Sequence, residues 1–131
     1  GIDTTQLKSL AEIVEEKTRH KFSPRKPIVG DDIFAWETGL PSNLWMNVKD
    51  VDPLIMLPYH PSLTGHKMPH LLLSKKSGMV NLNVWLEKVG VEILDLERKK
   101  ELLNVVKEYS LEHHKTLTEE EFRQILEEFN K

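Results

Sequence analysis

The chain of 131 residues contains no cysteine. That absence excludes disulfides, thiolate metal ligands and thiol nucleophiles together. It also fits the reducing conditions of the cytoplasm, where we expect the protein to reside. No apolar run approaches the length that crosses a bilayer, and no signal-peptide pattern opens the sequence, so we expect no membrane association.

An excess of basic residues is missing as well. The net charge is −3, with acids and bases interleaved along the sequence. A nucleic-acid partner requires a basic stripe, so we expect none. Of the six histidines, His60, His66 and His70 share one segment, but Pro69 disfavours the helix that would align His66 with His70. We predict solvated or locally hydrogen-bonded histidines and no metal site.

Apolar periodicity predicts four helices, at about 4–19, at about 79–89, from about 95 and from 118. We expect their apolar stripes to form core: Leu7, Leu10, Ala11 and Val14; Leu82, Trp85, Leu86 and Val89; Leu102, Val105, Val106 and Tyr109; Phe122, Ile125, Leu126 and Phe129.

Helix boundaries are marked by residues that are typical of caps. Asp3 is placed to cap the first helix. Gly78 opens the second and Gly90 closes it, since glycine adopts the left-handed conformation of a helix end. Thr118 and Glu121 have the spacing of a capping box, which predicts the start of the last helix.

All seven prolines lie between the first two helices, at positions 24, 27, 41, 53, 58, 61 and 69. Proline removes backbone donors, so long helices and central strands are disfavoured there. We predict a mainly α (α+β) fold, in which three to four helices carry a long extended arm with one or two short strands at most. The predicted parts are a leading helix (1–20), the arm (21–74) and a three-helix subdomain (75–131), together one compact unit of a larger enzyme.

The arm is too apolar to be a solvated linker. We expect its large side chains to lie against a surface that this chain does not provide: Ile28, Val29, Ile33, Phe34, Trp36, Leu44 and Trp45.

Several runs agree in order and spacing with one enzyme family. These are Pro-Arg-Lys-Pro-Ile-Val-Gly at 24–30, Phe-Ala-Trp-Glu-Thr-Gly-Leu-Pro at 34–41, Pro-Ser-Leu-Thr-Gly at 61–65 and Leu-Ser-Lys-Lys-Ser-Gly at 73–78. They resemble the region after the barrel in isopropylmalate, homocitrate and citramalate synthases. The resemblance implies condensation of acetyl-CoA with a 2-oxo acid on a divalent metal inside a TIM barrel.

The chain departs from the family pattern at its histidines. Trp36 and Pro41 stand where the family's Phe-x-His-Glu-Ser-Gly-Ile-His run has histidine, and Lys76 replaces a third. Neither indole nor proline can exchange a proton at neutral pH. The family's His-x-His metal pair is absent, and a (β/α)₈ barrel of about 250 residues is not present. We therefore expect no catalytic residue, no cofactor and no turnover in this chain alone.

Seven residues are candidate ligand or interface contacts: Trp36, Glu37, Trp45, Tyr59, Lys75, Ser77 and Gly78. Glu37 is either an acid/base group or a carboxylate that bonds the loop backbone. Tyr59 either anchors a substrate carboxylate or packs its loop. Ser77 either caps the following helix or helps backbone amides, with Lys75, to hold an anion.

Two functions remain open. The resemblance implies the carboxyl-terminal subdomain of a synthase, which embraces its own barrel or that of a partner subunit in a homodimer and closes the active site. The alternative is a freestanding, non-catalytic binding or regulatory domain that reuses the scaffold.

Overall fold

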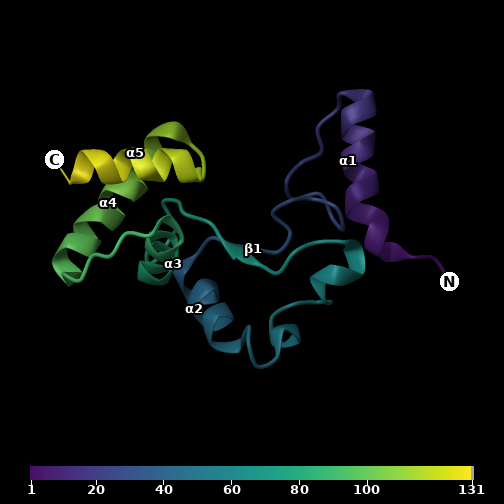
Figure 1. Cartoon of the computed structure of the whole chain (residues 1–131), viewed down its shortest axis with the longest axis horizontal. Helices are drawn as coiled ribbons and strands as arrows, with labels where there is room; N and C mark the ends of the chain where they lie inside the picture. Colours follow the sequence, from purple (N-terminus) through teal and green to yellow (C-terminus); the bar gives the residue numbers. More distant parts are fainter. Residues whose placement is uncertain (131) are drawn as a thin grey trace. The chain divides into compact units, whose positions relative to one another are not determined.

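A computed structural model describes residues 1–130. The chain forms two compact units. Unit 1 comprises Gly1–Ala35 and Val48–His70, and unit 2 comprises Trp36–Asn47 with residues 71–130. The fold is mainly α, as predicted, with five α-helices and one small two-stranded parallel sheet in the described residues (Figure 1).

Unit 2 holds the main hydrophobic core. Helices α3 (Met79–Val89), α4 (Leu96–His113) and α5 (Glu119–Phe129) pack in sequence, α3 on α4 and α4 on α5 (Figure 1). The predicted stripes of all three helices supply most of the core. Val89, Tyr109 and Phe129 are only partly buried against it, and Val105 is 38% exposed. The core residues are Leu73, Leu82, Trp85, Leu86, Ile93, Leu102, Leu103, Val106, Leu117, Phe122, Ile125 and Leu126.

The predicted caps of these helices are confirmed. The Thr118 side chain accepts from the Glu121 N–H, and the Glu121 carboxylate accepts from the Thr118 N–H. Gly90 closes α3 with a φ of 73°. The Asp95 side chain accepts from the Arg98 N–H at the start of α4. Each bond satisfies a backbone group that the helix itself leaves open.

Helix α2 (Gly39–Val48) was not among the predicted elements. Pro41 is its third residue, where an N–H has no partner within the helix, so proline is tolerated. The first helical bond runs from the Ser42 N–H to the Thr38 carbonyl at 3.1 Å. Trp45 on α2 is only 2% exposed, so the helix has a buried face.

The segment 21–74 is therefore not extended throughout. Besides α2 it contains the 3₁₀ turns η2 (Pro53–Ile55) and η3 (Pro61–Thr64), each of which opens with proline. The fixed φ of proline suits the first position of a helical turn. Strands β1 (Ala35–Trp36) and β2 (His70–Leu71) are short, in line with the prediction of one or two short strands at most.

In unit 1, the 3₁₀ turn η1 (Thr4–Gln6) leads into α1 (Leu7–Thr18), and the Asp3 carboxylate caps the start as predicted. The predicted core stripe of α1 is wrong in one respect. Ala11 is buried, but Leu10 is 55% and Val14 38% exposed. Periodicity identifies an apolar face, but not what covers it.

The core of unit 1 is small. Its buried hydrophobic side chains are Ala11, Phe34 and Leu57, beside the buried Pro61. Many of the large apolar side chains that the chain exposes belong to this unit: Ile2, Leu10, Ile13, Val14, Ile28, Val51, Leu54, Ile55, Leu63 and Met68. Among residues 1–130, no helix has the length and apolar character to cross a lipid bilayer.

Candidate functional site

Two segments that carry family-like runs lie side by side in unit 2. The Leu72 N–H donates to the Trp36 carbonyl at 2.9 Å. The Ser77 hydroxyl lies 3.2 Å from the Glu37 carbonyl and 3.1 Å from the Leu72 carbonyl, so it bridges both segments. This junction of residues 36–39 with 72–78 is the best-connected polar cluster among the candidate site residues.

Asn81 is the centre of the junction, and the sequence analysis missed it. Its amide nitrogen donates to the carbonyls of Leu72 at 2.9 Å and Glu37 at 3.3 Å, with Trp36 at 3.4 Å. Its oxygen accepts from the Gly78 N–H at 3.3 Å. The side chain is fully buried. One feature of the sequence could have identified Asn81. It is the only amide on the inner face of the helix, which is otherwise apolar, and it stands at the third helical position.

Two glycines let the segments approach. A Cβ at Gly78 would lie 3.0 Å from the Gly39 Cα, and a Cβ at Gly39 would lie 3.2 Å from the Gly78 Cα. Both distances are shorter than ordinary contacts of a side chain. The backbones therefore meet at a separation that larger residues would widen.

Glu37 bonds the loop. Its carboxylate accepts a 2.7 Å hydrogen bond from the Ser74 hydroxyl, and Ser74 is 1% exposed. The same Ser74 oxygen accepts from the Lys76 N–H at 3.1 Å. This bond comes from a side-chain hydroxyl and not from the loop backbone, so the two roles considered for Glu37 stay open.

Ser77 does not cap α3, so that interpretation is wrong. Gly78 is the N-cap residue, and the Ser77 oxygen instead accepts from the Ser74 N–H at 2.8 Å. The N–H groups of Ser77 and Gly78 already donate to the Ser74 carbonyl and to Asn81. These two amides are not open to an anion; Lys75 is exposed beside them.

Trp36 carries a buried donor without an acceptor. Its indole nitrogen has no hydrogen-bond partner within residues 1–130, and neither has the buried Ser42 hydroxyl. An unmet buried polar group costs about 1–3 kcal/mol. By contrast, Trp45 and Phe34 are only 2% and 5% exposed in this chain. This corrects the expectation that an outside surface buries Phe34 and Trp45.

In unit 1, aromatic and histidine side chains pack a turn. The Tyr59 ring lies edge-on to Phe34 at 5.4 Å, and the His66 ring does likewise at 5.4 Å. His66 also contacts the Gly30 carbonyl through Nε2 at 3.1 Å and the Thr64 hydroxyl through Nδ1 at 3.0 Å. Tyr59 thus packs the loop, and both nitrogens of His66 have local partners, as the sequence predicted for these histidines.

The Pro-Arg-Lys-Pro-Ile-Val-Gly run forms a tight turn. A Cβ on Gly30 would lie 2.3 Å from the Pro24 carbonyl oxygen, so only glycine fits there. Ile28 has a φ of 72°, which is strained for a β-branched residue, and it is 49% exposed. A strained, exposed apolar residue is a candidate contact for a partner.

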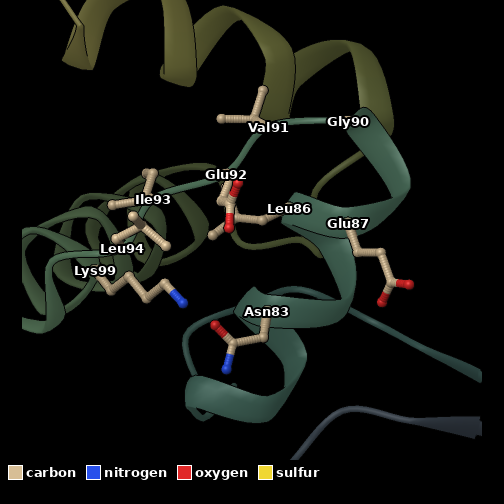
Figure 2. A pocket seen from close by; sticks show the side chains of 9 residues that line it. All are labelled: Asn83, Leu86, Glu87, Gly90, Val91, Glu92, Ile93, Leu94 and Lys99. Atoms are coloured by element: carbon tan, nitrogen blue, oxygen red, sulfur yellow. The ribbon is translucent and has the colours of Figure 1, made fainter.

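Each unit has a hollow on its surface within the described residues. One in unit 2, of about 380 Å³, is bordered by Asn83, Leu86, Glu92 and Lys99 among others (Figure 2). One in unit 1, of about 330 Å³, includes Lys8, whose ammonium bonds Asp31. In the part of the chain that the structure describes, no three histidine or acidic side chains converge to hold a metal ion.

Comparisons with known proteins relate the chain to homocitrate, citramalate and isopropylmalate synthases. No family model matches the chain. The sequence is 34% identical over 98% of this chain to homocitrate synthase AksA of Methanocaldococcus jannaschii. It is 29% identical over 98% of the chain to homocitrate synthase 1 of Nostoc, and 34% over 79% to 2-isopropylmalate synthase of Acetivibrio thermocellus.

The chain belongs to the family of homocitrate, citramalate and isopropylmalate synthases and corresponds to part of such a protein. It spans 30%, 32% and 19% of the length of the three relatives described above. That share fits a carboxyl-terminal region, as the resemblance predicted.

Proposed function

We propose that the chain is the carboxyl-terminal subdomain of an isopropylmalate/homocitrate-synthase-like acyltransferase. In the complete enzyme it covers a barrel, helps to assemble a homodimer and closes the active site in the cytoplasm. Acetyl-CoA and a divalent metal, which the family resemblance implies for the complete enzyme, bind to the barrel. This chain alone does not catalyse the condensation.

One observation carries the proposal: unit 1 exposes more large apolar side chains than it buries. Val51 is 84%, Ile55 65% and Ile28 49% exposed. At about 25 cal/mol per Å² of apolar area, covering such side chains yields several kcal/mol before ordering costs. A barrel surface that covers unit 1 would supply the core that the unit lacks.

In the complete enzyme, the Asn81 junction would hold the backbone of residues 36 and 37 in place beside the opening of the active site. It fixes the backbone of Trp36 and Glu37, and the indole N–H of Trp36 remains without an acceptor within the described chain. An acceptor from the barrel or from a bound 2-oxo acid would meet that donor. The junction itself holds no proton-transfer pair, so its part is to position and to exclude water.

The test supplies a barrel from a relative. The M. jannaschii homocitrate synthase, truncated before the region that matches this chain, is mixed with the chain, and complex formation is followed by size-exclusion chromatography with light scattering. We expect co-elution and slower amide exchange in unit 1, whereas the chain alone releases no CoA from acetyl-CoA. Turnover by the chain alone, or unchanged exchange with no complex, would refute the proposal.

The second candidate is a freestanding binding or regulatory domain that pairs with a separately encoded barrel. Trp36 and Pro41, which stand where the family has histidines, favour it, since a regulatory partner needs no proton-transfer group. The reading frame around Gly1 discriminates the two. A barrel-coding stretch in frame upstream supports the subdomain, and a start codon there supports the freestanding domain.

A further inference from the structure

Ile28 has a backbone conformation that its side chain disfavours. Its φ of 72° lies in the left-handed region, where a β-branched residue is an outlier. Glycine adopts this conformation without cost and asparagine at little cost, whereas the Cβ of other residues crowds the following carbonyl oxygen. Among residues 1–130, the other non-glycine residues with a positive φ are Arg19 and His114, and each is the C-cap of a helix. Ile28 ends no helix, so its conformation needs another explanation.

The turn around Ile28 holds this conformation in place. The Gly30 N–H donates to the Lys26 carbonyl and the Asp32 N–H donates to the Pro24 carbonyl, both at 2.8 Å. Gly30 also lies so close to Pro24 that a Cβ on it would meet the Pro24 carbonyl oxygen at 2.3 Å. Since the backbone is bonded on both sides of Ile28, a change of its φ would break the turn.

The chain itself gains little from the isoleucine. Ile28 is 49% exposed, so about half of its side chain contacts nothing in unit 1. A glycine or an asparagine would form the same turn with less strain. Strain of this kind is stored at functional sites, where a contact outside the turn offsets it.

We propose that Ile28 is an anchor side chain, which in the complete synthase inserts into an apolar recess of the barrel. The apolar area that it buries there offsets the strain of the turn. The inference rests on the proposed function, which makes the barrel the partner of unit 1. The chain spans only 30% of the length of homocitrate synthase AksA of M. jannaschii, so most of such a protein is available to supply the recess.

The rigidity of the turn suits an anchor. A β-branched side chain on a fixed backbone has few rotamers, so it loses little conformational freedom when it is bound. The strain is then a cost that the free chain already bears, and it adds nothing to the cost of binding.

The proposal predicts effects of opposite sign on stability and on binding. Ile28→Asn relieves the strain, so the urea midpoint of the free chain should stay the same or rise. The same substitution removes the apolar contact, so the dissociation constant for the barrel should rise by about tenfold or more. Ile28→Val keeps the strain and most of the apolar surface. It should leave the urea midpoint unchanged and raise the dissociation constant by about fourfold at most.

The experiment takes the truncated M. jannaschii homocitrate synthase as the barrel and measures the binding of each variant by isothermal titration calorimetry. Urea denaturation of each free chain gives the midpoints. Leu94→Asn is the matched control, because it makes the same kind of change at a residue of unit 2 that is 86% exposed. It should change neither the midpoint nor the dissociation constant.

The outcomes separate this inference from the proposed function. No complex with the wild-type chain would refute both. A complex that Ile28→Asn leaves as tight as the wild type, or that Leu94→Asn weakens equally, would overturn the anchor alone. A lower urea midpoint for Ile28→Asn would show that the side chain serves its own turn, and this too would overturn the anchor.

Discussion

Asn81 joins three backbone carbonyls and one N–H in a fully buried position. A side-chain amide donates through its NH₂ group and accepts through its oxygen, so it can bond both kinds of backbone group at once. The family-like run made Ser77 and Gly78 visible in the sequence, but no pattern indicated which carbonyls Asn81 would reach. Bonds between residues some 45 positions apart depend on tertiary structure.

We predict that Asn81→Ala lowers the free energy of unfolding by about 2–3 kcal/mol, because it leaves buried carbonyls without donors. Asn83→Ala, two residues further on the same helix and exposed, is the matched control and should change stability by less than about 0.5 kcal/mol. Urea denaturation measures both. Equal effects of the two substitutions would show that the junction adds nothing to stability.

Glu121 is the residue whose charge depends most on folding. The Lys115 ammonium, the Thr118 N–H and the Tyr109 hydroxyl lower its pKa from 4.5 to about 2. A lowered pKa in the folded state adds stability above the unfolded pKa near 4.5, and this contribution is lost as pH falls toward 2.

Glu121→Gln should therefore be less stable than the wild type at pH 7, and the difference should shrink steadily between pH 4.5 and 2. Thermal unfolding at a series of pH values measures it. A difference that is constant with pH would mean that Glu121 acts through its cap geometry and not through its charge.

At the scale of elements, helices α3, α4 and α5 could be predicted because periodicity and caps agree. Helix α2 could not, since Gly39 and Pro41 mark turns as readily as they mark the first turn of a helix. The apolar stripe of α1 could be predicted from the sequence, but the side of the helix that faces the inside of unit 1 could not. Lys8 has an ionic partner and Glu15 a backbone partner inside unit 1, which the sequence does not indicate.

The element-scale prediction concerns the close approach of α2 and α3. Gly78→Ala should destabilise the chain by about 1–3 kcal/mol, because its Cβ would press on the Gly39 Cα. The φ of Gly78 is −103°, so alanine is conformationally allowed and the effect reports packing alone. Urea denaturation that shows no loss would mean that the segments separate without cost.

At the scale of the whole molecule, the two units differ in how they are held together. Unit 2 has a continuous core, whereas unit 1 is held by a few buried side chains, ion pairs and proline-led turns. The central claim is that unit 1 is completed by another surface. The apolar, proline-rich composition of the arm indicated this. The sequence also placed Phe34 and Trp45 on that surface, whereas the structure buries both side chains within this chain.

Native-state hydrogen exchange of the chain alone, at a concentration below any self-association, tests this claim most directly. The account predicts that amides of α1 exchange through openings of much lower free energy than those of α4 and α5. Equal protection of α1 and α5 would contradict it, because unit 1 would then be stable without a partner.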